Sequence, residues 1–312
     1  MIYKHRTESK ELLLYRFVNA RATLSQSDMQ YYWTLEKGYE GEVQFDHLLQ
    51  NLQGEFILVN DLLFEINNTY FQIDSLLLAP EKIHLFDVKN FENDYIIDND
   101  NNWYSYSILK NDRKKESKNP IHQLNRCETL LKQQLQKLGF KSPITSKLVF
   151  INPKFYLYQA PPNYPIVFPT QLDRFINQLN SQLTTAKLKD RDFKLAQQLL
   201  QNHKVDSPFK NSPDYSYDGL KKGIYCKSCR SFDVFTNPKT IVCNKCGFRE
   251  KIEAAVLRGV DEFMLLFPDI KVTTNAISEW CGIIKSEITI RKILNKNYKT
   301  IGKHRGTHYV DK

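Results

Sequence analysis

The sequence predicts a mixed α/β domain, in which a β-sheet is flanked by helices, followed by a small cysteine-rich module and a basic helical domain. Three observations lead to this organisation. Residues 70–90 have the pattern of a β-hairpin and lie between stretches of helical periodicity. Four of the six cysteines form two Cys-x-x-Cys pairs. Residues 219–312 contain 18 Lys+Arg and 9 Asp+Glu, whereas residues 1–218 contain 26 of each, so the whole net charge of +9 lies in the last part of the chain.

The 312 residues allow two or three domains with ample core. Hydrophobic content of 41% and charged content of 25% are ordinary for a soluble globular protein. No run of 18 apolar residues is present, and the first residues lack the apolar segment of a signal peptide. These features predict a cytoplasmic protein without a membrane partner.

The hairpin is organised around a four-residue turn at 79–82, with Pro at its second position. If Ala79 pairs with Lys82, Asp74 lies opposite Asp87. Side chains alternate between the two faces of a strand, so four polar residues share one face. These residues are Gln72, Asp74, Asp87 and Lys89.

Asp74 and Asp87 would have Cβ atoms about 4.5–5.5 Å apart in this register. Two carboxylates at that spacing repel each other unless a cation lies between them. A divalent metal ion with oxygen ligands would remove the repulsion, and Lys89 lies one pair further along. The alternative is that both aspartates are solvated on an open face of the hairpin, but the apolar residues around them favour the metal site.

Helical periodicity precedes the hairpin. Residues 8–34 read as helical and mixed, so residues 1–34 are expected to form an extension that packs on the core. Residues 35–52 form a second helix whose apolar stripe includes Glu42. Burial of an unpaired carboxylate is costly, so Glu42 should be paired, neutralised or bound to metal. Alternatively, Glu42 lies at the edge of the stripe.

The other elements follow from local patterns. Residues 56–60 read as a short strand, 61–63 as a turn, and 91–107 as further strands, which together predict a central sheet of four or five strands. Asn119 and Pro120 are typical of the N-cap and first position of a helix, which ends at Gly139. The remaining expected elements are a surface loop at 110–118, a buried strand at 146–151, a long loop or insertion at 152–169, helices at 170–179 and 193–200, and a linker at 206–222.

Asp74 followed by Asp87-Val88-Lys89 resembles the core motif of the PD-(D/E)xK nuclease superfamily. More closely, residues 38–139 resemble the nuclease-related domain (NERD) family. Many relatives have Glu where this chain has Asp87, and the superfamily pattern allows either. The matching stretches are Gly38-Tyr39-Glu40-Gly41-Glu42, Val59-Asn60-Asp61-Leu62, Gln72-Ile73-Asp74, Phe86-Asp87-Val88-Lys89-Asn90, Trp103 and Asn119-Pro120-Ile121-His122-Gln123.

The resemblance implies a restriction-endonuclease-like fold over residues 35–205 and a nuclease that depends on Mg²⁺ or Mn²⁺. Asp74 and Asp87 would bind the metal, and Glu42 would be a further ligand or a base. Lys89 would orient the attacking water or stabilise developing negative charge. The resemblance assigns Gln123 to the edge of the active site, where it would help to place the water, although a lone polar residue in a first helical turn is equally expected to be solvated.

The two Cys-x-x-Cys pairs are separated by 13 residues. Four thiolates on two knuckles around a short hairpin favour a closed, tetrahedral and structural Zn²⁺ site, with iron as the alternative. The strands would be residues 232–235 and 240–242, and residues 223–250 look like a zinc ribbon. Cys127 and Cys281 stand in helical patterns and are expected to be small core residues. The zinc ligands would be Cys226, Cys229, Cys243 and Cys246.

Residues 251–312 resemble a small winged helix-turn-helix domain. Helices are expected at 253–267, 276–280 and 287–295, followed by two strands around Gly302-Lys303-His304-Arg305-Gly306. With the excess charge located here, the third helix would enter a groove of nucleic acid and the basic turn would contact phosphate. The alternatives are a winged helix that binds protein and a basic surface that only improves solubility. The predicted nucleic-acid contacts are Arg291, Lys292, Lys296, Lys303 and Arg305.

The sequence therefore favours a metal-dependent nuclease that hydrolyses phosphodiester bonds, with DNA as the expected substrate and a zinc-ribbon and winged-helix tail that holds the nucleic acid. One alternative is a non-catalytic DNA-binding or regulatory protein that uses the nuclease fold as a scaffold, and another is a structural adaptor. The patterns leave open whether the substrate is DNA or RNA, its strandedness, endonuclease against exonuclease action, the sequence specificity, the pathway and the oligomeric state.

Overall fold

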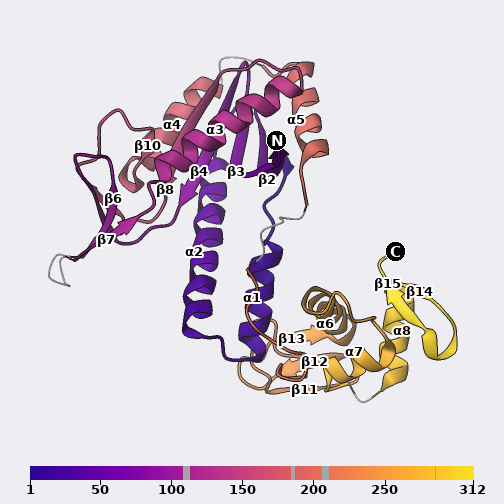
Figure 1. The fold of residues 1–312 in the computed structure, drawn as a ribbon. Helices are drawn as coiled ribbons and strands as arrows, with labels where there is room; N and C mark the ends of the chain where they lie inside the picture. Colours follow the sequence, from indigo (N-terminus) through magenta and orange to yellow (C-terminus); the bar gives the residue numbers. More distant parts are fainter. Residues whose placement is uncertain (108–112, 184–186, 206–210, 285) are drawn as a thin grey trace. The chain divides into compact units, whose positions relative to one another are not determined.

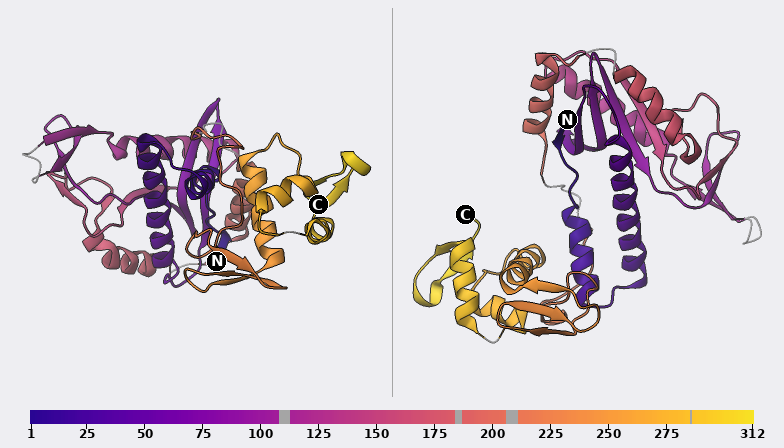
Figure 2. Two further views of the ribbon diagram at one scale, coloured as in Figure 1. Left: turned by 90° about the horizontal axis from the view of Figure 1, so that it is seen from below. Right: turned by 180° about the vertical axis from the view of Figure 1, so that it is seen from behind.

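A computed structural model describes residues 1–107, 113–183, 187–205, 211–284 and 286–312 (Figures 1 and 2). The chain divides into two compact units. The core unit comprises Met1–Glu8 and Trp33–Phe209, and the tail unit comprises Ser9–Tyr32 and Lys210–Lys312. The first 34 residues, which we expected to form one extension on the core, are thus divided between the units.

The core unit is built on a mixed sheet, which confirms the predicted α/β class. Within the described residues this sheet has six strands, in the order β1-β2-β3-β4-β8-β10. Strands β2, β3 and β4 are antiparallel, whereas the pairs β1–β2, β4–β8 and β8–β10 are parallel. The strands are β1 (Ile2–Lys4), β2 (Ile57–Ile66), β3 (Thr69–Ala79), β4 (Lys82–Lys89), β8 (Ile144–Phe150) and β10 (Ile166–Val167).

The sheet is larger than expected because two short strands join its edges. The N-terminal strand β1 pairs with β2, and β10 arises inside the segment 152–169 that we expected to be a loop. Both pairings depend on main-chain hydrogen bonds to a strand elsewhere in the chain. Neither β1 nor β10 is long enough to show the alternating pattern from which a strand can be predicted.

Helices cover both faces of the sheet (Figure 1). Helices α3 (Pro120–Lys137) and α5 (Asp190–Asn202) bury apolar residues against one face, with Leu124 and Leu199 fully buried. Helices α2 (Gln26–Leu49) and α4 (Leu172–Leu183) cover the other face, where Phe45 packs edge-on against Phe86. The alternation of side chains along each strand supplies both apolar faces.

The hairpin has the predicted register, with Ala79 paired to Lys82 and Ser75 to Phe86. The expected turn at 61–63 is wrong. Strand β2 continues through it because one register holds on both sides, from Asn60–Ser75 to Leu62–Ile73. Within β2, only Asp61 has a positive φ, of 52°.

The strands expected over 91–107 do not extend the central sheet. They form a second sheet in the order β7-β6-β5-β9, anchored by Trp103, which is fully buried. The polar loop expected at 110–118 instead contains a strand, and residues 108–112 lie outside the described residues. The strands are β5 (Asp94–Ile97), β6 (Trp103–Ser107), β7 (Arg113–Ser117) and β9 (Tyr156–Tyr158).

Helix α2 begins nine residues before the start that we expected at residue 35. The Ser25 hydroxyl accepts a hydrogen bond from the backbone N–H of Asp28 at 3.1 Å and donates to the Asp28 carboxylate at 2.7 Å. This arrangement satisfies a free N–H group of the first turn, as a capping residue does. The apolar stripe used for the prediction marks only the part of the helix that faces the sheet.

The tail unit contains α1 (Lys10–Arg21), three ribbon strands and three further helices in its described part. The ribbon strands β11 (Val234–Thr236), β12 (Thr240–Cys243) and β13 (Arg249–Lys251) are antiparallel. Arg21 joins α1 to the first of the three helices, since its guanidinium pairs with Glu262 at 2.7 Å and lies 3.9 Å from the centre of the Trp280 ring. The remaining elements are α6 (Ile252–Leu266), α7 (Thr274–Cys281), α8 (Glu287–Asn297), β14 (Lys299–Ile301) and β15 (His308–Val310).

Among the described residues, no helix is long and apolar enough to cross a membrane.

Candidate active site and cysteine centre

The hairpin brings Asp87 and Lys89 into contact. The Lys89 ammonium lies 2.6 Å from Asp87 Oδ1, and both side chains are largely buried. Asp74 on the neighbouring strand accepts a hydrogen bond from the backbone N–H of Val88 at 2.9 Å. Strand pairing ends at Ser75–Phe86, just before the two aspartates, and this frees the backbone N–H of Val88 for the carboxylate.

A third aspartate lies at the same level of the sheet. The register between β2 and β3 places Asp61 opposite Asp74, as the register of the hairpin places Asp74 opposite Asp87. Three adjacent strands therefore each present an aspartate at one level. The sequence contained the signal for Asp61, but the predicted turn hid it, because residues in a turn have no strand register.

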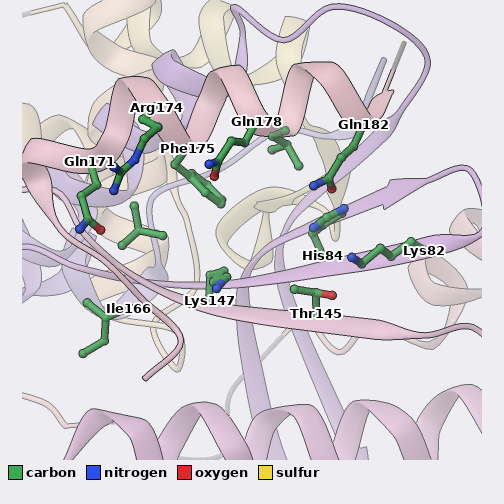
Figure 3. A pocket seen from close by; sticks show the side chains of 12 residues that line it. Lys82, His84, Thr145, Lys147, Ile166, Gln171, Arg174, Phe175, Gln178 and Gln182 are labelled. Atoms are coloured by element: carbon green, nitrogen blue, oxygen red, sulfur yellow. The ribbon is translucent and has the colours of Figure 1, made fainter. Parts of the chain in front are cut away.

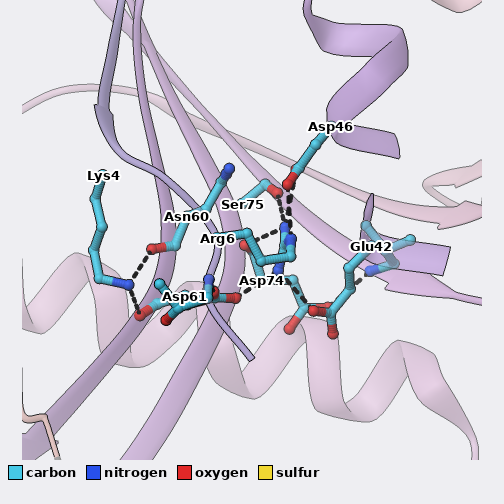
Figure 4. Close-up of polar contacts among 10 residues, drawn as sticks. Lys4, Arg6, Glu42, Asp46, Asn60, Asp61, Asp74 and Ser75 are labelled. Carbon is cyan, nitrogen blue, oxygen red and sulfur yellow. Dashed lines mark hydrogen bonds and ion pairs between the residues drawn. The ribbon is translucent and has the colours of Figure 1, made fainter. Parts of the chain in front are cut away.

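Arg6 is the main residue that the sequence analysis missed. Its buried guanidinium donates to Glu42 Oε2 at 2.7 Å, to Asp61 Oδ1 at 2.5 Å and, through two nitrogens, to Asp46 at 2.8 and 3.0 Å (Figure 4). It also donates to the main-chain carbonyl of Asp74 at 3.0 Å. One arginine from the N-terminal segment thus connects α2 with strands β2 and β3.

Glu42 lies in α2 and faces this cluster, as its position in the apolar stripe predicts. Burial and the nearby Asp74 carboxylate raise the pKa of Glu42 to about 8, although Arg6 opposes the shift. Burial also raises the pKa of Asp87 to about 7, with Lys89 opposing and Asp74 adding to the shift. Burial alone would lower the pKa of Lys89, but Asp87 and Asp74 raise it above its usual value. The nearby cations Arg6 and Lys89 therefore do not fully compensate the negative charge that Glu42 and Asp87 carry when they are ionised.

Gln123 is exposed in the first turn of α3, and no hydrogen bond between described residues joins it to the acidic cluster. Cys127 lies one turn further along the same face of α3. Its thiol donates to the Gln72 carbonyl at 3.3 Å, and burial, Asp74 and Asp87 raise its pKa to about 12. Cys127 is partly buried and packs against the hydrophobic core, as expected, and the face of α3 that carries Cys127 and Gln123 points to the side of the sheet with Asp74.

The carboxylates fit Mg²⁺ only in part. In the described part of the chain, no set of three carboxylates has oxygens that all lie within 4.8 Å of one another. The reason is that Arg6 holds Glu42, Lys89 holds Asp87 and the Val88 N–H holds Asp74. Mg²⁺ is commonly bound by one or two carboxylates together with waters and substrate phosphate. Asp74 and Asp87 could supply such a pair.

The four predicted cysteine ligands converge in the ribbon. Their sulfurs all lie within 4.8 Å of one another, with 3.6 Å between Cys226 and Cys246 and 3.5 Å between Cys229 and Cys243. A tetrahedral site with Zn–S bonds of about 2.3 Å would place its sulfurs about 3.8 Å apart. The cluster is therefore preformed for a structural zinc, and the predicted zinc ribbon is confirmed as a fold.

The residues predicted to contact nucleic acid differ in their exposure and in their pairing with other side chains. Arg291 and Lys292 in α8 and Lys303 after β14 are exposed. Lys296 forms an ion pair with Glu253 at 2.8 Å, so its charge is partly engaged within the unit. The side chain of Arg305 lies outside the described part of the structure.

Comparison with known proteins agrees with this geometry. An acidic cluster with a paired lysine, carried on adjacent strands of a mixed sheet, is the arrangement expected of a nuclease-like α/β domain. Residues 37–151 match the family model described as nuclease-related domain (NERD). Glu42, Asp74, Asp87 and Lys89 lie within this matched range. The core unit therefore contains a nuclease-related domain, as the sequence motifs predicted. No curated protein and no solved structure matched the chain.

Proposed function

We propose that the protein is a metal-dependent nuclease that hydrolyses phosphodiester bonds in DNA. The observation that carries this proposal is the contact of Asp87 with Lys89, next to Asp74, inside a nuclease-related domain. A fold needed only as a scaffold gains nothing from placing Asp87 and Lys89 together in a largely buried position beside a second aspartate, because desolvation of charged groups is costly.

In this proposal Asp74 and Asp87 hold Mg²⁺ or Mn²⁺, and Glu42 is a further ligand or the base. When bound, the metal would lower the pKa of a water and neutralise the scissile phosphate. Lys89 stabilises negative charge as it develops on the phosphate, from a position fixed by Asp87. Gln123 would help to position the attacking water from the first turn of α3.

The contacts of Arg6 favour a second candidate function, that of a DNA-binding scaffold without cleavage. Arg6 already supplies a cation to Glu42 and Asp61, at 2.7 and 2.5 Å. A protein that binds DNA without cutting it would use Arg6 in this way to keep an inherited acidic site folded without metal. The two functions differ in whether Asp74 and Asp87 still bind a divalent cation.

The tail unit is proposed to hold the nucleic acid. A β-bridge between Val272 and Tyr309 joins the segment before α7 to the final hairpin. The order of α6, this bridge, α7, α8 and the hairpin β14–β15 supports a winged helix-turn-helix domain. Arg291 and Lys292 on the exposed side of α8, together with Lys303, would contact phosphate groups.

The test is incubation of the full chain with labelled single-stranded DNA, double-stranded DNA and RNA, with Mg²⁺, with Mn²⁺ and with EDTA. We expect divalent-ion-dependent cleavage of DNA that Asp87→Asn reduces at least a hundredfold, while Asp173→Asn, an exposed control in α4, retains it. Cleavage that persists in EDTA, or that Asp87→Asn does not change, would contradict the proposal. Binding of DNA without cleavage under every condition would favour the scaffold.

A further inference from the structure

A cavity of about 280 Å³ lies between α4 and the strands β4, β8 and β10 of the core unit (Figure 3). We propose that this cavity binds the phosphate group of a small ligand of the nucleoside monophosphate class. The proposal is independent of the nuclease function, because the cavity and the acidic cluster use different side chains.

The strand side of the cavity follows from the register. His84 pairs with Thr145 and Phe86 pairs with Lys147 in the parallel ladder, so the side chains at these positions point to one face of the sheet. Lys82 is two residues before His84 and shares that face. Asp87 and Lys89 stand at the alternate positions of the same strand and therefore point to the other face.

Helix α4 supplies the opposite wall. Its lining residues recur at steps of three or four, which places them on one side of the helix, facing the strands (Figure 3). They are Arg174, Phe175, Gln178, Leu179 and Gln182. Gln171 lies just before the helix and also lines the cavity.

The lining is cationic. It contains Lys82, Lys147 and Arg174 and neither an aspartate nor a glutamate. Within the described part of the chain, no ion pair or hydrogen bond occupies the charged groups of these three residues. Three unneutralised cations around one cavity attract an anion, and a phosphate with several acceptor oxygens can receive a hydrogen bond from each of them.

His84 gives the second, independent indication of a ligand. The residue is only 3% exposed, and its Nε2 has no hydrogen-bond partner in the part of the chain that the structure describes. Burial and the positive charge of Lys82 lower the pKa of His84 to about 4, so the ring is neutral at pH 7. A buried polar atom without a partner is costly, and a ligand that hydrogen-bonds to Nε2 would remove this cost.

The rest of the lining indicates an organic ligand rather than a free inorganic ion. Phe175, Leu179, Ile166 and Val167 form an apolar wall beside the cations. The volume is at the lower limit for a small-molecule site, about 300 Å³. A ligand with a phosphate group next to the cations and a flat ring against Phe175 would fit both the cationic and the apolar part of the lining. A nucleic-acid strand would instead need a continuous groove.

The experiment is isothermal titration calorimetry of the full chain with AMP, adenosine and inorganic phosphate, in buffer without added Mg²⁺ or Mn²⁺ so that no such ion bridges the nucleotide to the acidic cluster. We expect AMP to bind at least tenfold more tightly than adenosine and more tightly than inorganic phosphate. Lys147→Gln and Arg174→Gln should each weaken AMP at least fivefold. Lys194→Gln, an exposed lysine in α5 outside the cavity, should leave the affinity unchanged.

A site-specific measurement separates this cavity from the basic tail unit. On addition of AMP, the NMR signal of the His84 ring should shift, and His84→Phe should weaken binding while thermal unfolding shows that the protein remains folded. Equal affinities for AMP and adenosine, no AMP binding at millimolar concentration, or AMP binding that none of the cavity variants changes would each overturn the proposal.

Discussion

Arg6 and Glu42 form an ion pair with a distance of 2.7 Å between Nη1 and Oε2, and this contact ties the N-terminal segment to the acidic cluster. The Arg6 side chain is only 3% exposed. Asp46, Glu42 and Asp61 raise its pKa although burial alone would lower it, so Arg6 remains charged. The acidic site is therefore completed by a residue that lies outside the segment matched by the family model.

Replacement of Arg6 by Gln should destabilise the core unit by about 3 kcal/mol. This is the lower end of the range for removal of one partner of a buried ion pair, and we choose it because the three carboxylate partners of Arg6 are partly exposed. Urea denaturation measures this change, with His5→Gln as an exposed control. A loss below about 0.5 kcal/mol would mean that water or ions replace Arg6 without cost.

The stability of the metal-free core unit should depend on pH in an unusual direction. The pKa values of Glu42 and Asp87 are raised in the folded state, so these groups bind their protons more tightly when folded. Their contribution to stability is complete below the unfolded values of about 4 and is lost as the pH rises through about 7 to 8. Thermal unfolding in EDTA should therefore show a loss between pH 5 and pH 8 that Asp87→Asn reduces, and Mg²⁺ or Mn²⁺ at pH 8 should restore stability. An identical pH profile for Asp87→Asn would contradict the assignment.

The cysteine cluster should hold one zinc per chain. Elemental analysis of the purified protein measures the metal, and Cys243→Ser should lose it and unfold the ribbon, because the energy of metal binding is used for folding. Cys127→Ser, a thiol outside the cluster, should retain the zinc. Iron in place of zinc, or full retention of metal by Cys243→Ser, would refute this prediction.

The salt dependence of DNA binding should come from the exposed cations of the tail unit. Each phosphate contact steepens the slope by about 0.9 log units per log unit of salt on duplex DNA, so Arg291→Ala with Lys292→Ala should reduce the slope by up to about 1.8. Lys296→Ala should act less strongly, because Lys296 is paired with Glu253. A titration of DNA binding with salt measures the slopes, and Lys137→Ala with Lys194→Ala on the core unit is the matched control. If the control pair changes the slope as much, the tail unit is not the DNA anchor.

The sequence alone determined the parts of this protein that depend on local spacing. The turn at 79–82 fixed the hairpin register, and with it the position of Asp74 opposite Asp87. The spacing of the four cysteines predicted the preformed cluster, and the cap at Asn119 marked the start of α3.

Only the tertiary structure decided the contacts between residues far apart in the chain. Arg6 reaches Glu42 and Asp61 because β1 pairs with β2, and a single arginine in a polar N-terminal segment has no pattern that reveals this pairing. Asp61 is a second example, because its local conformation is that of a turn although it lies inside a continuous strand. The cavity at His84 likewise required the register of β4 with β8 and the packing of α4, because strand pairing and helix packing gain their energy from partners that local sequence does not specify.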